Sequence, residues 1–69
     1  MNMNVYELCL LFVGFSINSI ENVIILSKHV QIFKGNCETA MYSDYSCKYI
    51  QNFKVENKTI IINIDWREA

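Results

Sequence analysis

The last third of the chain carries the pattern that most constrains its fold. Apolar and polar residues alternate from Phe53 to Glu56, a polar pair follows at Asn57-Lys58, and the alternation then resumes up to Trp66. Period-two alternation of β-branched and aromatic residues is typical of a half-buried antiparallel strand, and asparagine tolerates the left-handed conformation of a tight turn. The sequence therefore predicts a terminal hairpin. The face expected to be buried carries Ile60, Ile62, Ile64 and Trp66.

Shorter apolar segments upstream predict further strands. Residues 23–26, 30–33 and 38–42 each fit a short strand, and polar residues separate them. A turn is expected at 27–29. A hairpin turn is expected at Lys34-Gly35-Asn36, because glycine adopts positive φ angles without steric cost. Residues 47–52 fit either a short helical turn or an irregular strand.

These segments predict a mainly β fold. About five to six short strands, with turns roughly every seven to ten residues, suggest a small, strongly curled antiparallel sheet or barrel. The alternative is an α+β fold in which an N-terminal helix packs on the sheet. Because the chain has only 69 residues, we expect one small domain spanning residues 1–69.

The composition favours a folded unit that associates with another molecule. Hydrophobic residues make up 52% of the chain, charged residues only 19%, and the net charge is -1. This balance lacks the basic excess that phosphate binding requires, which argues against a general nucleic-acid binder. High apolarity with little charge predicts that a partner or a second copy covers part of the surface.

Residues 8–15 form the densest apolar run of the sequence. A transmembrane helix needs about 20 apolar residues, so the run is too short to span a bilayer. A secretory signal would start with basic residues, and none precedes the run. We therefore expect no membrane association.

The secondary structure of this run is ambiguous. An i, i+3, i+7 spacing links Leu8, Leu11 and Phe15 and fits a helix, whereas Gly14 and the aromatic content favour a strand. The strand is preferred, and because both of its faces would be apolar, a homo-oligomer would cover it. The residues expected to mediate self-association are Leu8, Leu10, Leu11, Phe12, Val13 and Phe15.

Residues able to carry chemistry are scattered. Cys9, Cys37 and Cys47 are odd in number and widely spaced, which argues against a disulfide scaffold and favours the free thiols of a cytoplasmic protein. Whether Cys37 and Cys47 pair stays open. Together with His29 the cysteines do not form the paired ligand spacing of a structural zinc site. The carboxylates stand singly, and two glycines are too few for a phosphate loop. We expect no catalytic, cofactor or metal site, and no enzyme.

One group of aromatic and basic residues is a candidate partner surface. It consists of Tyr42, Tyr45, Lys48, Tyr49 and Lys54. Tyrosine is common at protein interfaces, because it buries a large area and keeps a polar group. Aromatic rings beside cations also bind single-stranded nucleic acid in small barrels. In a third interpretation, the tyrosines belong to the core or its rim.

The expected function is that of a small non-catalytic protein-binding module. Asn, Ile and Lys together fill a third of the chain, a bias typical of AT-rich coding sequence. By analogy with compact phage and mobile-element accessory proteins, the module is expected to act as a stoichiometric inhibitor of a host or defence protein. The alternatives are a single-stranded nucleic-acid-binding small barrel and a host regulatory or assembly subunit.

Overall fold

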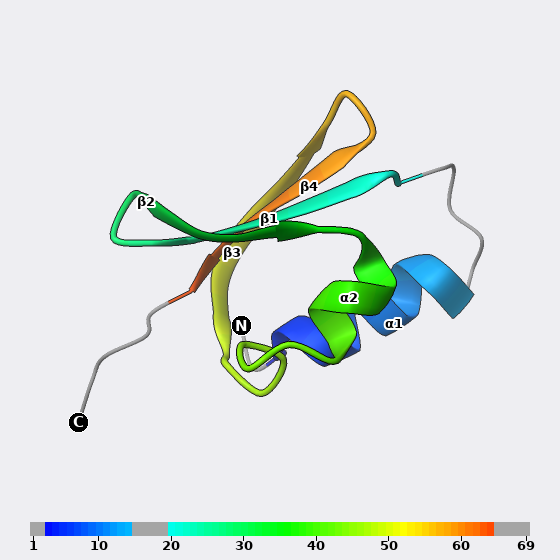
Figure 1. The fold of residues 1–69 in the computed structure, drawn as a ribbon, viewed down its shortest axis with the longest axis horizontal. Helices are drawn as coiled ribbons and strands as arrows, with labels where there is room; N and C mark the ends of the chain where they lie inside the picture. The colour runs from blue at the N-terminus through cyan, green and yellow to red at the C-terminus, as the bar shows by residue number, and fades with distance from the viewer. Residues whose placement is uncertain (1–2, 15–19, 65–69) are drawn as a thin grey trace.

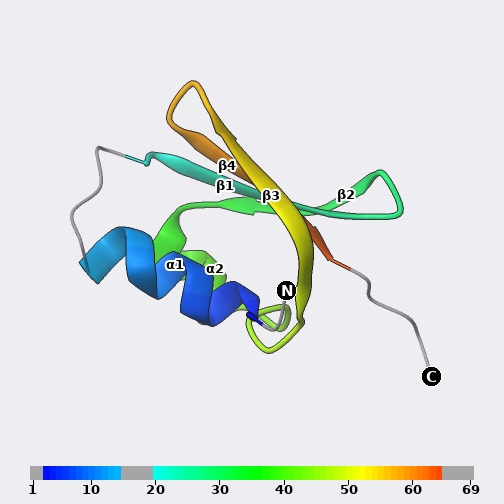
Figure 2. The same cartoon turned by 180° about the vertical axis from the view of Figure 1, so that it is seen from behind.

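The computed structural model describes residues 3–14 and 20–64. Its elements follow the chain in the order α1 (Val5–Gly14), β1 (Asn22–Ser27), β2 (Val30–Gly35), α2 (Cys37–Met41), β3 (Ile50–Glu56) and β4 (Thr59–Ile64). The four strands form one sheet in the order β2-β1-β4-β3. Both helices lie on the same side of this sheet (Figure 1 and Figure 2).

The sheet consists of two antiparallel hairpins joined through a parallel pair. β1 pairs with β2 and β3 pairs with β4 in antiparallel fashion, whereas the central strands β1 and β4 run parallel. The prediction of a mainly β fold is confirmed. The prediction of a curled antiparallel sheet or barrel with five to six strands is wrong, because the sheet is open, mixed and four-stranded. The position of α1 matches the alternative with an N-terminal helix on the sheet.

The terminal hairpin is confirmed. Asn57 and Lys58 form the turn between β3 and β4, with φ angles of 50° and 61°. β4 alternates between buried and half-buried residues, because one face of the strand points toward the helices and the other does not. The buried residues are Ile60, Ile62 and Ile64. Trp66 lies outside the described residues.

The turn of the first hairpin lies within residues 27–29, where the sequence predicted it. Lys28 and His29 connect β1 to β2 and have φ angles of 51° and 69°. The prediction of a second turn at residues 34–36 is wrong, because β2 continues to Gly35 and a helix follows. Gly35 has no positive φ. A Cβ atom on Gly35 would lie 2.9 Å from Cζ of Phe33, so close packing against this ring, rather than turn geometry, favours glycine here.

The segment 38–42, predicted as a strand, belongs largely to helix α2. Asn36 is the N-cap of α2, and its side-chain oxygen accepts a hydrogen bond from the backbone N–H of Thr39 at 2.7 Å. An asparagine that satisfies a free N–H of the first turn stabilises a helix start. Residues 47–52 contain the irregular start of β3, with a register shift between Ile50 and Asn52.

The N-terminal run is helix α1, so the preferred strand assignment is wrong. The start of α1 is stabilised by reciprocal hydrogen bonds between Asn4 and Glu7. The Asn4 side chain accepts from the Glu7 N–H at 2.8 Å, and the Glu7 carboxylate accepts from the Asn4 N–H at 3.1 Å. This arrangement is a capping box, which satisfies two backbone donors at once.

The core lies between the helices and one face of the sheet. Across the parallel pair, Val23 lies beside Ile60 and Ile25 beside Ile62, and all four side chains are buried. The buried hydrophobic residues are Val5, Leu8, Cys9, Val23, Ile25, Cys37, Ala40, Ile50, Ile60, Ile62 and Ile64. The opposite face of the sheet, which no helix of the described chain covers, is called the helix-free face below.

Candidate functional site

The two sides of α1 differ in burial but hardly in polarity. Val5, Leu8 and Cys9 are buried against the core. The side of α1 that points away from the core is also apolar. It carries Tyr6, Leu10, Leu11 and Val13, whose exposed fractions are 39%, 46%, 40% and 53%. These four residues are called the outer face of α1. A surface helix normally carries polar and charged residues at such positions.

The only charged residue of α1 lies at its first turn. Glu7 reaches back to the N–H of Asn4 in the capping box, so its carboxylate stays at the N-terminal end of the helix. The rest of the outer face around Leu10 carries no charge. Contiguous exposed apolar side chains on a small protein mark interaction sites, because isolated exposed residues are common and clusters are not.

The set predicted for self-association divides between the two sides of α1. Leu8 is only 2% exposed and belongs to the core, so its assignment to an interface is wrong. Phe12 is half-buried and packs edge-on against Phe53, with ring centroids 6.4 Å apart. Leu10, Leu11 and Val13 are exposed. Phe15 lies outside the described residues. Tyr6 belongs to the same surface and was not anticipated, although its spacing of four from Leu10 was visible in the sequence.

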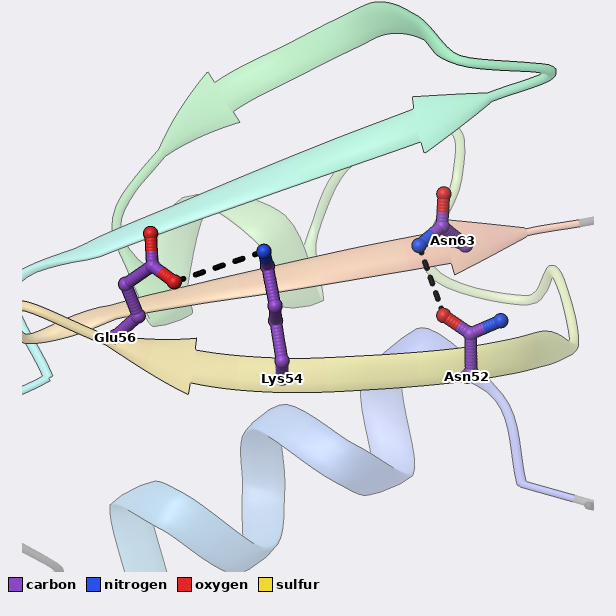
Figure 3. A network of polar contacts seen from close by, with 4 residues as sticks. All are labelled: Asn52, Lys54, Glu56 and Asn63. Atoms are coloured by element: carbon purple, nitrogen blue, oxygen red, sulfur yellow. Dashed lines mark hydrogen bonds and ion pairs between the residues drawn. The ribbon is translucent and has the colours of Figure 1, made fainter.

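The residues predicted as a partner surface do not form one surface. Tyr42 caps the end of α2 and is exposed, and Tyr49 directly before β3 is exposed as well. Tyr45 packs edge-on against Phe33 at 6.4 Å and contacts the core. Lys54 is on β3, where it forms an ion pair with Glu56 at 3.6 Å (Figure 3). Its register partner Ile61 is on the helix-free face.

Backbone contacts join the tyrosine-bearing loop to the start of α1. The N–H of Val5 donates to the carbonyl of Lys48 at 3.1 Å, and that of Tyr6 donates to the carbonyl of Ser46 at 2.9 Å. Asn4 and Tyr49 form an isolated β-bridge. Lys48 is half-buried at this junction. The loop that carries Tyr49 is therefore joined through its backbone to the N-terminal end of α1.

The helix-free face of the sheet is more polar than the outer face of α1. Its central residues Ile24, Leu26 and Ile61 are half-buried by their neighbours. Lys34 pairs with Ile24 at one edge, and Lys54 pairs with Ile61 at the other. The side-chain amide of Asn63 donates to that of Asn52 at 2.8 Å on the same face (Figure 3). Asn52, Asn63, Lys54 and Glu56 are therefore already paired with one another on this face, and its apolar centre is partly covered.

The two buried cysteines, Cys9 and Cys37, are not arranged as reactive groups. Cys9 and Cys37 are buried and Cys47 is exposed, and all three are free thiols. Burial raises the pKa of Cys9 to about 12, and the neighbouring Cys37 adds to this rise. Burial also raises the pKa of Cys37, against an opposing hydrogen bond with Cys9. A catalytic cysteine requires a lowered pKa that yields thiolate near neutral pH.

Residues 3–14 and 20–64, which the structure describes, contain neither a metal-ligand cluster nor a membrane-spanning helix. No group of three or more His, Cys, Asp or Glu side chains in this part of the chain is placed to hold a metal ion. None of the described helices is long and apolar enough to cross a membrane. No family model, curated protein or solved structure matches the chain.

Proposed function

We propose that this chain is a small non-catalytic protein-binding module that binds through the outer face of α1. The observation that carries this proposal is the cluster of Tyr6, Leu10, Leu11 and Val13, which are exposed and uncharged on one side of a helix. Covering the exposed part of each leucine or valine would stabilise a complex by about 1 kcal/mol. A binding partner is therefore a direct way to remove this surface from water.

The edges of the sheet are less suited to binding by strand addition. Each antiparallel pair contains a register shift. In the β1–β2 pair, Ile32 of β2 has no opposite residue, and in the β3–β4 pair, Gln51 of β3 has none. β2 and β3 are the two edge strands. Bulges and charged residues on edge strands discourage pairing with another strand, which leaves faces rather than edges for association.

The size of the molecule indicates that the interface extends beyond α1. A standard interface buries roughly 800 Å² on each partner. The accessible surface of this chain is 4746 Å², so such an interface would cover roughly a sixth of it. Tyr49 is exposed and pairs through its backbone with Asn4, the residue before α1, so it is placed to extend the contact. Tyrosines at this kind of position are frequent anchors of interfaces.

A module of this kind acts by occupying a surface of its target. As a stoichiometric inhibitor it would cover a functional surface of a host or defence protein. As a regulatory or assembly subunit it would hold a complex together without blocking it. Activity of the target with and without the chain separates these two roles, once the target is known.

The test is capture of binding proteins with matched variants. Leu10→Lys places a charge at the centre of the outer face of α1, whereas Val30→Lys places the same charge at an exposed position on β2. We expect proteins that associate with the wild-type chain to be lost with Leu10→Lys and retained with Val30→Lys, with both variants folded by circular dichroism.

Two outcomes would contradict the proposal. One is that both variants retain the same partners, which would place the binding surface elsewhere. The other is salt-sensitive binding to single-stranded oligonucleotides that is lost with Tyr49→Ala, which would favour the nucleic-acid alternative.

A further inference from the structure

The outer face of α1 is complementary to a second copy of itself. We propose that two copies of the chain associate through α1, with the helices antiparallel and a two-fold axis passing near Leu10. This inference rests on the proposed protein-binding function and names the partner of the same surface.

The spacing of residues on α1 makes the surface self-complementary. Tyr6, Leu10 and Gly14 stand four residues apart, and such a row forms the ridge that most often packs against a neighbouring helix. With the axis at Leu10, the two Leu10 side chains meet, and Tyr6 of each copy lies opposite Gly14 of the other. Among the described residues, apart from the chain neighbours of Gly14 and the backbone of its own helix, no atom lies within 4 Å of the Cβ position at Gly14, so α1 itself leaves room there for a ring.

Charge favours the antiparallel arrangement over the parallel one. A parallel pair would bring the two Glu7 carboxylates and the two positive helix N-termini together, and both contacts are repulsive. In the antiparallel pair the two Glu7 residues lie on opposite sides of the axis. The helix rise and a normal interhelical distance place them about 12 Å from each other. The capping box holds each carboxylate at its own helix start, away from Leu10.

The size of the contact predicts a weak, concentration-dependent dimer. α1 has 10 residues, and its outer face is smaller than the roughly 800 Å² that each partner of a stable complex buries. Tyr49, beside the start of α1, would add to the contact at the Gly14 end of the second copy's helix. Interfaces at the small end of the range are transient, so monomer and dimer are expected to exchange at micromolar concentration.

A cysteine at the two-fold axis tests this geometry directly. In a Cys47→Ser background, which removes the exposed native thiol, Leu10→Cys places two thiols next to each other in the dimer. Glutathione disulfide then oxidises this thiol pair to one disulfide and is itself reduced to two glutathione molecules. We expect the covalent dimer of Leu10→Cys to form roughly tenfold or more faster than that of the exposed control Val30→Cys.

The direction of packing is tested by mixing two variants in the same background. Antiparallel helices predict that Tyr6→Cys protein cross-links to Gly14→Cys protein faster than either cross-links to itself. Faster self-cross-linking of Tyr6→Cys would show parallel helices and overturn the proposal. Light scattering after size-exclusion chromatography should show a mass that rises with concentration for wild type and Val30→Lys, and a constant monomer mass for Leu10→Lys.

Failure of this inference is distinguishable from failure of the proposed function. A wild-type chain that stays monomeric, with Leu10→Cys no faster than Val30→Cys, overturns the second copy as partner. The binding function still holds in that case if capture of another protein is lost with Leu10→Lys and kept with Val30→Lys. A dimer that persists in Leu10→Lys overturns the inference, because a different surface then holds the copies together.

Discussion

α1 and β4 are both short apolar runs, yet only β4 folds as its sequence predicts. In β4, buried isoleucines alternate with half-buried residues that include Thr59 and Asn63, so the polar residues reveal the period. In α1, the buried side and the exposed side are both apolar, and Glu7 is the only charged residue. A hydrophobic pattern identifies an element only when its exposed side is polar. The property that conceals the helix in the sequence is therefore the same one on which the proposed binding surface rests.

The largest expected effect tests the burial pattern of β4. Ile62 is fully buried and lies beside Ile25, so Ile62→Ala should lower the free energy of unfolding by about 2–5 kcal/mol. A domain of this size has only ~5 kcal/mol in reserve, so the variant should be largely unfolded. Ile61 is half-buried on the helix-free face, so Ile61→Ala should lower the free energy of unfolding by about 1 kcal/mol. Urea titration followed by circular dichroism gives both values.

Equal losses for the two isoleucine variants would contradict this pattern. They would mean that the helix-free face is as well covered in solution as the face against the helices. A second layer would then pack on Ile61, and the surface that associates would be the sheet rather than α1.

The second effect tests the same contrast on α1. Leu8→Ala should lower the free energy of unfolding by about 2–4 kcal/mol, because Leu8 is buried between the helix and the core. Leu10→Ala should change it by less than about 0.5 kcal/mol when measured on dilute protein, because exposed side chains contribute little. Thermal unfolding at low micromolar concentration measures both. A large loss for Leu10 with a small loss for Leu8 would show that the helix is rotated about its axis.

The strands were predictable because their signals are local. The alternation on β4 and the polar turn pairs at Lys28-His29 and Asn57-Lys58 lie within a few residues of each other. The parallel pairing of β1 with β4 joins segments far apart in the sequence, and no local signal specifies it. Antiparallel neighbours were therefore expected, and the number of strands suggested a barrel.

Helix α2 was missed and helix α1 was expected only as the alternative, for two physical reasons. α2 has five residues, which is too short to show a helical period, and its cap at Asn36 was interpreted as a turn residue. The glycine at position 35 also favours a turn in the sequence, although close packing against Phe33 explains why a glycine is found there. For α1 the informative signal was the cap, since Asn4 and Glu7 have the spacing of a capping box. Caps indicate helices even where hydrophobic periodicity does not.

The candidate surface was predictable only in part. The apolar run contains Leu10, Leu11 and Val13, which the structure leaves exposed, but sequence alone could not separate them from the buried Leu8 while helix and strand both remained open. Lys54 was grouped with the tyrosines because it is near them in the sequence. Strand alternation in β3 places Lys54 on the helix-free face, whereas Tyr49 contacts the segment before α1.

The smallest effect sharpens the contrast by improving the β3–β4 hairpin without altering α1. Lys58 has a φ of 61°, which is unfavourable for a residue with a Cβ atom and favourable for glycine. Lys58→Gly should raise the free energy of unfolding by about 0.5–1 kcal/mol, measured by thermal unfolding. The substitution also removes an ion pair with Glu21 at 3.9 Å, in which both side chains are exposed, so little stability is lost with it.

Lys58→Ala is the matched control, because it removes the ion pair but keeps the unfavourable φ. A gain with Lys58→Gly but not with Lys58→Ala would show that local backbone geometry limits this hairpin, whereas equal stability of the two variants would show that it does not.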